Sequence, residues 1–143
     1  TDPSQIGWLM NMMSAFSSAF TILFMFWSIT MLLQKIVGST DSNTSTQNIT
    51  ILGSALVGSL AFTFTDSFWF NAVETEVYAM ATLIMSVMFY LGLRWEQDMF
   101  KPRGNKWLIL ISFITGLSFG VHFMGLLTIP AIGLIYFFKN DFL

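Results

Sequence analysis

Three carboxylates lie between two strongly apolar runs of this chain, in the segment Asp66-Ser-Phe-Trp-Phe-Asn-Ala-Val-Glu-Thr-Glu76. The chain has no lysine or arginine between Lys35 and Arg94, so no basic residue close in sequence neutralises these acids. A carboxylate at the edge of a bilayer is costly and usually marks a site for a cation, a proton or a polar substrate. We therefore expect the function to centre on Asp66, Glu74 and Glu76.

The backbone conformation of this segment decides what its side chains can do together. In a helix, Asn71, Glu74 and Tyr78 share one face, whereas Glu76 points about 200° away from Glu74. In an extended segment, Glu74 and Glu76 lie on one side and can share a divalent cation, Mg²⁺ or Mn²⁺, through oxygen ligands. A structural role stays open beside these two, because first-turn carboxylates suit the positive end of a helix dipole.

Other reactive residue types are scarce. The chain has no cysteine, which excludes thiolate chemistry and disulfides within it, and its single histidine, His122, excludes a multi-histidine metal site. His122 is expected either to be hydrogen-bonded at a helix end or to meet a phosphate or a glutamate. The net charge of −2 provides no basic field, so nucleic acid is not an expected partner.

The composition indicates that membrane lipids surround the chain. It is 55% hydrophobic and 17% aromatic but only 10% charged, with a mean hydropathy of +0.69, whereas soluble domains carry about 25% charged residues. A soluble core cannot hide so much apolar surface in 143 residues. We expect an all-α fold, a polytopic transmembrane helical bundle that forms one partial domain over residues 1–143.

Charge placement favours five spans over four. The run 107–138 exceeds one crossing of a core of roughly 30 Å, and glycines near its middle allow a hairpin. Breaking it there places all six basic residues on one face, which the positive-inside rule makes cytoplasmic. The acidic segment and His122 then face outside. The predicted spans are about 7–35, 49–65, 77–93, 107–120 and 124–138.

The remaining segments have simpler interpretations. Serines in the first half of the first span predict that this half faces other helices. Residues 38–48 form a polar linker that we expect to be a loop. Arg94-Trp-Glu-Gln-Asp98 is interpreted as part of a solvated, interfacial loop. Because the chain starts at Thr1 with no basic leader and ends after an apolar run, we expect an internal piece of a longer membrane protein.

Three segments carry a family resemblance. Asp66-Ser-Phe-Trp-Phe-Asn-Ala-Val-Glu-Thr-Glu-Val-Tyr-Ala-Met80 resembles the signature of the bacterial family first catalogued as domain of unknown function 2723. Met10-Asn-Met-Met-Ser-Ala-Phe-Ser-Ser-Ala-Phe-Thr-Ile-Leu-Phe24 is similar to an early span of that family. Gly116-Leu-Ser-Phe-Gly-Val-His-Phe-Met-Gly-Leu-Leu-Thr-Ile-Pro-Ala131 resembles a later span. The three segments occur in the family's order and extend over nearly the whole chain.

The resemblance implies a protein O-mannosyltransferase-like glycosyltransferase of the C-type membrane architecture. Such an enzyme moves a sugar, here expected to be mannose, from a lipid-phosphate-linked donor to a protein acceptor such as Ser or Thr. It implies a bacterial inner membrane with the acidic segment facing the periplasm. The family's main catalytic carboxylate is expected in an Asp-Ser-Gly-Glu-Phe-type motif upstream of Thr1, so the catalytic base is unknown here and this fragment alone is expected to be inactive.

Within the resemblance, Glu74 and Glu76 match a second acidic motif that serves a cation, the donor phosphate or the acceptor. Asn71, Asp66, Tyr78 and His122 are candidates for hydrogen bonds to donor or acceptor. Two other classes remain open: a proton- or cation-coupled transporter subunit, and a non-catalytic membrane scaffold. Transport sites usually lie near the midplane on broken helices, whereas these acids lie at a span end.

Overall fold

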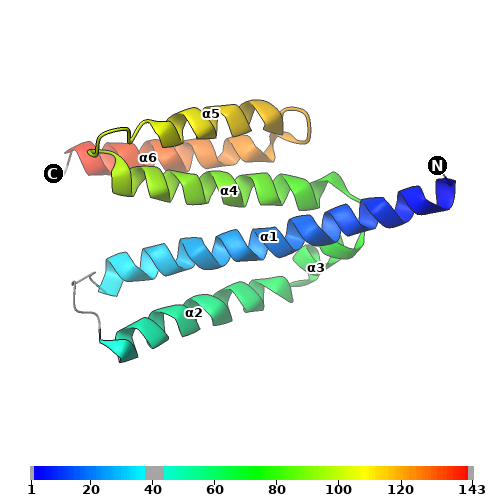
Figure 1. The fold of residues 1–143 in the computed structure, drawn as a ribbon, viewed down its shortest axis with the longest axis horizontal. Coiled ribbons are helices and arrows are strands. Elements are labelled where there is room, and N and C mark those ends of the chain that lie inside the picture. Colours follow the sequence, from blue (N-terminus) through cyan, green and yellow to red (C-terminus); the bar gives the residue numbers. More distant parts are fainter. Residues whose placement is uncertain (1, 38–43, 142–143) are drawn as a thin grey trace.

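The computed structural model describes residues 2–37 and 44–141, and this part of the chain is helical and contains no strand. Antiparallel rods run between two opposite ends of the bundle (Figure 1). In chain order the elements are α1 (Pro3–Val37), α2 (Ser45–Thr63), α3 (Asp66–Val73), α4 (Val77–Asp98), α5 (Lys106–Ser118), the 3₁₀ helix η1 (Phe123–Leu127) and α6 (Thr128–Asp141).

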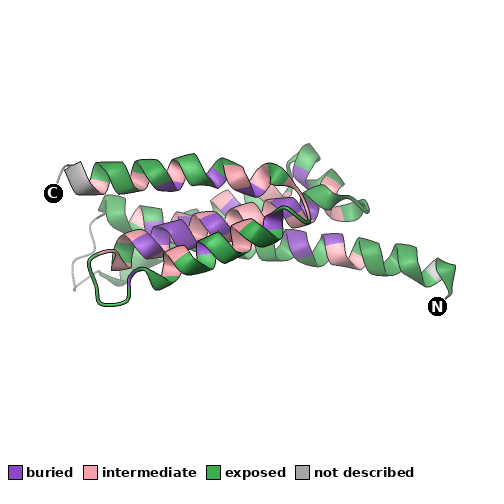
Figure 2. Cartoon of the chain, turned by 90° about the horizontal axis from the view of Figure 1, so that it is seen from above, coloured by how far each residue is buried: buried purple, intermediate pink, exposed green. Residues whose placement is uncertain are grey.

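Helix α4 is the centre of the bundle. It packs against α1 on one side and against α5, η1 and α6 on the other, while α2 packs against α1. The core cluster joins Met88, Leu91 and Trp95 of α4 to Ile111 of α5 and Ile132 of α6. Figure 2 shows this buried centre, beyond which the first turns of α1 extend as an exposed arm.

The prediction that the first half of α1 faces other helices is correct from Ser14 onward, whereas the described side chains of residues 3–11 are exposed. Ser14, Ser17 and Ser18 are each no more than 5% exposed, and Thr21 on the same face is equally buried. Small polar residues at a helix interface let two backbones approach closely in a membrane. Thr21 donates its hydroxyl to the Ser17 carbonyl at 2.9 Å, so its polar group is satisfied within the helix.

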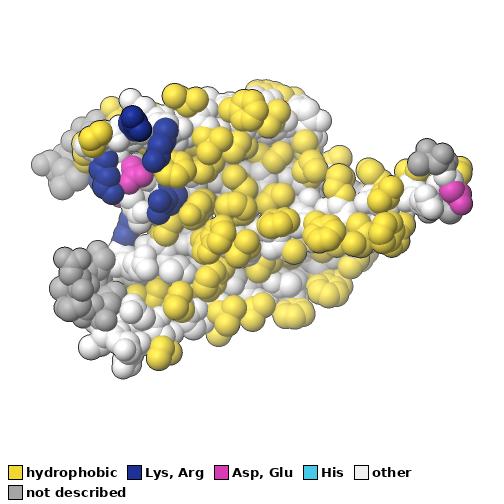
Figure 3. All heavy atoms as spheres, viewed as in Figure 1, with side chains coloured by type: hydrophobic (Ala, Val, Ile, Leu, Met, Phe, Trp, Pro, Cys, Tyr) yellow, Lys and Arg dark blue, Asp and Glu magenta, His cyan; other side chains and the backbone are white. Residues whose placement is uncertain are grey.

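The surface and the helix lengths suit a bilayer. Large apolar side chains cover the sides of the bundle, and the lysines and arginines gather at the end where α1, α4 and α6 finish (Figure 3). We call this the basic end and the opposite end the acidic end. Helices α1 and α4 are long and apolar enough to span a membrane, and α2 with α3 makes a third candidate bent by 68°. Crossings by the shorter helices α5 and α6 stay a prediction.

Several helix ends differ from the predicted ones, and the predicted span 124–138 begins as the 3₁₀ helix η1 before α6. Two of these differences change an interpretation. Part of the predicted linker, residues 38–43, lies outside the described residues. Its last four residues belong to α2, because Gln47 accepts a hydrogen bond from the Thr44 backbone N–H at 3.0 Å and forms a capping box. Helix α4 continues to Asp98, so the interpretation of Arg94–Asp98 as a solvated loop is wrong: Trp95 is 5% exposed and stacks on Tyr136 at 5.9 Å.

Cysteine labelling tests the five-span topology, since the chain itself contains no cysteine. Single cysteines at Thr75, His122 and Arg103 are introduced into the full-length protein, and any cysteine outside these 143 residues is replaced by serine. A membrane-impermeant maleimide applied from outside is expected to label the first two and to label Arg103→Cys only after permeabilisation. Labelling of the Thr75 and His122 sites from opposite sides would contradict the hairpin of α5 and α6.

Candidate functional site

The two candidate glutamates lie in a non-helical turn at the acidic end. Helix α3 ends at Val73 and α4 begins at Val77. The helical alternative, in which Asn71, Glu74 and Tyr78 share one face, is therefore wrong. Both glutamates have extended backbones, with φ −100° at Glu74 and −129° at Glu76, and the Glu76 N–H donates to the Glu74 carbonyl at 3.0 Å. Both residues are exposed. The carboxylates thus project from a short, exposed turn.

The residue between the glutamates anchors this turn to α1. The Thr75 hydroxyl donates a hydrogen bond to the side-chain carbonyl of Asn11. Asn11 lies 24 positions before Lys35, which corresponds to about 36 Å of helix at 1.5 Å per residue. This length slightly exceeds the thickness of a hydrocarbon core, about 30 Å. If Lys35 lies at one surface of the membrane, the two glutamates therefore lie close to the opposite surface.

A second loop meets the first at the acidic end. The rings of Tyr78, in the first turn of α4, and His122, just before η1, have centroids 5.3 Å apart. His122 Nδ1 accepts a hydrogen bond from the Met124 N–H at 3.2 Å. In a neutral imidazole this leaves Nε2 as the donor. Of the two expectations for His122, the hydrogen-bonded helix-end residue is the one observed, and its ring partner is a tyrosine.

Asp66 and Asn71 are separated from the two glutamates. Asp66 begins α3 and Glu74 follows its end, so about 12 Å of helix lies between them. Asp66 and Asn71 instead share an open hollow of about 400 Å³ with Ser67 and Phe70. The structure therefore brings the six predicted residues to one end of the bundle but divides them between two neighbouring surfaces.

A divalent cation fits the glutamate turn only as a partial site. No group of three or more His, Cys, Asp or Glu side chains that could hold a metal occurs within the described residues. Two carboxylates are nevertheless the donors that Mg²⁺ takes when it keeps several waters and completes its shell with substrate phosphates. A site for Mg²⁺ or Mn²⁺ at Glu74 and Glu76 therefore stays a prediction.

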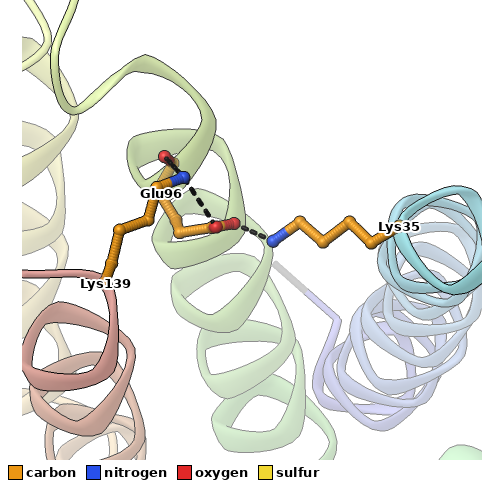
Figure 4. Close-up of polar contacts among 3 residues, drawn as sticks. All are labelled: Lys35, Glu96 and Lys139. Atoms are coloured by element: carbon orange, nitrogen blue, oxygen red, sulfur yellow. Dashed lines mark hydrogen bonds and ion pairs between the residues drawn. The ribbon is translucent and has the colours of Figure 1, made fainter. Parts of the chain in front are cut away.

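Sequence reasoning missed a charged cluster at the basic end. Glu96 of α4 pairs with Lys35 of α1 and with Lys139 of α6, whose Nζ lies 2.8 Å from Glu96 Oε1 (Figure 4). Lys139 also donates to the Glu96 backbone carbonyl at 2.8 Å. The Glu96 side chain is only 13% exposed. The one signal in the sequence was that all three residues fall near the predicted inner ends of spans.

These features define an all-helical membrane domain with exposed carboxylates at one end. The chain matches, over residues 1–142, the family model described as Protein O-mannosyl-transferase TMEM260 N-terminal domain. The chain therefore belongs to that family, whose description is of a glycosyltransferase and implies a sugar donor and a protein acceptor. No curated protein and no solved structure matches the chain.

Proposed function

We propose that this domain belongs to an integral-membrane enzyme that transfers mannose from a lipid-phosphate-linked donor to a Ser or Thr hydroxyl of a protein. The observation that carries the proposal is the exposed Glu74–Glu76 turn at the acidic end of the bundle, in a chain of an O-mannosyl-transferase family. Thr75 links this turn to Asn11 of α1, and Tyr78 and His122 lie at the same end. In this proposal the membrane is a bacterial inner membrane, which rests on the family resemblance alone. The acidic end faces the periplasm, because the positive-inside rule places the basic end in the cytoplasm.

The proposed reaction inverts the sugar centre in one displacement. The acceptor hydroxyl oxygen attacks the anomeric carbon, the bond from that carbon to the lipid phosphate oxygen breaks, and the hydroxyl proton passes to a carboxylate upstream of Thr1. General-base help of this kind contributes typically 10²–10⁴-fold. The departing phosphate carries the electron pair and needs positive charge nearby.

The residues of this chain would act around that displacement. Glu74 and Glu76 would hold a divalent cation, which supplies charge neutralisation for the departing phosphate when bound. His122, through Nε2–H before η1, and the Tyr78 hydroxyl, in the first turn of α4, would donate hydrogen bonds to sugar or phosphate. Asp66 and Asn71, on the neighbouring hollow, are better placed for the acceptor than for the cation.

The test is sugar transfer by the full-length protein in membranes, with a polyprenyl-phosphate mannose donor and a Ser/Thr-rich acceptor. We expect transfer that falls at least about tenfold with EDTA and returns with Mg²⁺ or Mn²⁺, as loss of an electrostatic stabiliser predicts. Transfer that resists EDTA would show that no divalent cation is required. Basic residues elsewhere in the protein would then have to stabilise the departing phosphate. Absence of transfer across several donors would overturn the proposal in favour of a transporter subunit or a scaffold.

A further inference from the structure

A groove runs along α4 between α1 and α6. These two helices do not pack against each other within the described residues, so α4 forms the floor and they form the walls. Two adjoining hollows of about 380 and 680 Å³ make up the groove, and they share Leu32, Phe89 and Ala131 as lining residues. Their volumes lie in the range of about 300–1,000 Å³ that is usual for ligand sites.

The part of the groove nearer the acidic end presents mainly apolar surface. Several hydroxyl residues line it, but each donates its proton within the bundle. Thr82 donates to the Tyr78 carbonyl at 2.6 Å, Ser28 to the Phe24 carbonyl at 2.8 Å, and Thr128 to the Gly125 carbonyl at 2.6 Å. Because these hydroxyl donors are already hydrogen-bonded to backbone carbonyls, the groove suits a hydrocarbon chain better than a polar molecule or a row of water molecules.

The other part of the groove ends in the charged cluster of Lys35, Glu96 and Lys139 (Figure 4). Two lysines face one carboxylate, which leaves one positive charge in excess. The side chains of Lys35 and Lys139 remain 38% and 24% exposed, so each keeps ammonium donors for a further partner. The end of the groove therefore complements an anionic group at the membrane surface.

We propose that this groove binds an anionic phospholipid from the leaflet at the basic end. Its acyl chain lies along Leu32, Phe89 and Ala131, and its phosphate meets Lys35 and Lys139. The polyprenyl-phosphate donor fits less well, since its phosphate belongs at the acidic end, about 36 Å away along α1. The preference over polyprenyl phosphate rests on the proposed function, whereas the binding of an anionic lipid in the groove does not.

The test compares binding of phosphatidylglycerol, phosphatidylcholine and undecaprenyl phosphate to the delipidated full-length protein by native mass spectrometry. Glu96→Gln adds one net positive charge and is expected to strengthen phosphatidylglycerol binding about fivefold, the effect of one charge at an anionic surface. The triple variant Lys35→Gln/Glu96→Gln/Lys139→Gln removes the excess charge and is expected to weaken it about fivefold without stranding a charge. Phosphatidylcholine binding should change in neither variant.

Two matched controls separate the groove from the surface in general. Lys101→Gln/Lys106→Gln removes basic residues from the same end outside the groove and should leave lipid binding unchanged. Ala131→Phe fills the groove and should abolish phosphatidylglycerol binding, whereas Ala61→Phe, on the exposed surface of α2, should not.

Four outcomes would overturn the proposal. The first is equal binding of phosphatidylglycerol and phosphatidylcholine by the wild type, and the second is weaker phosphatidylglycerol binding by Glu96→Gln. The third is a loss of phosphatidylglycerol binding in the Lys101/Lys106 variant as large as in the triple variant. The fourth is tighter binding of undecaprenyl phosphate than of phosphatidylglycerol in the groove. Variants are compared only where their size-exclusion elution profile, followed by fluorescence, matches that of the wild type. The variant Lys35→Arg/Lys139→Arg keeps both positive charges and should bind phosphatidylglycerol like the wild type.

Discussion

Glu74→Gln and Glu76→Gln are each expected to lower the rate of sugar transfer by about 10²-fold, the usual cost of removing one preorganised electrostatic group from an active site. Each substitution keeps the shape of the side chain and removes its charge. Both glutamates are exposed and neither side chain caps α4 by a hydrogen bond, so the fold should not depend on the charges. Initial rates are measured with the full-length protein in membranes at matched expression.

The controls for this prediction come from the same end of the bundle. Asp66→Asn removes a carboxylate about 12 Å of helix away and should leave the cation dependence of the rate unchanged. Thr75→Ser retains the hydroxyl that Asn11 accepts from and should retain activity. Full activity in both glutamine variants would show that Glu74 and Glu76 are only interfacial residues. A lower transfer rate in only one variant would show which carboxylate the reaction requires.

Apolar pattern was enough to predict an all-helical membrane fold, whereas the hairpin of spans near its end stays a prediction. Helix ends were harder to predict from the sequence, because the apolar pattern stops at the first charged residue. Arg94, Glu96 and Asp98 therefore ended the predicted third span, although the helix continues through all three. Glu96 is tolerated there since two lysines from other helices pair with it.

The site was predictable as a set of residues but not as an arrangement. The helix break between Val73 and Val77 has no glycine or proline to mark it, so the helical and extended alternatives looked equally open. Contacts across elements, such as Thr75 with Asn11 and Tyr78 with His122, depend on how α1, α4 and η1 pack. A single sequence contains no direct record of such packing.

Glu96→Gln is also expected to lower the free energy of unfolding by about 1–2 kcal/mol in a neutral detergent. Glu96 is the only carboxylate that the two lysines share within the described residues, so neutralising it leaves two ammonium groups facing one another. A hydrogen bond to a charged group is worth about 1.5–3 kcal/mol, and the partial exposure of Lys35 reduces that value through solvent screening.

The triple variant Lys35→Gln/Glu96→Gln/Lys139→Gln should regain most of this loss, because replacing a whole ion cluster is often neutral whereas stranding one charge is not. Thermal unfolding followed by tryptophan fluorescence measures both variants against the wild type. A triple variant less stable than Glu96→Gln would show that the cluster stabilises the bundle by more than mutual neutralisation. Anionic lipid should raise the stability of Glu96→Gln more than that of the triple variant, since only the former keeps the lysines that the lipid phosphate would meet.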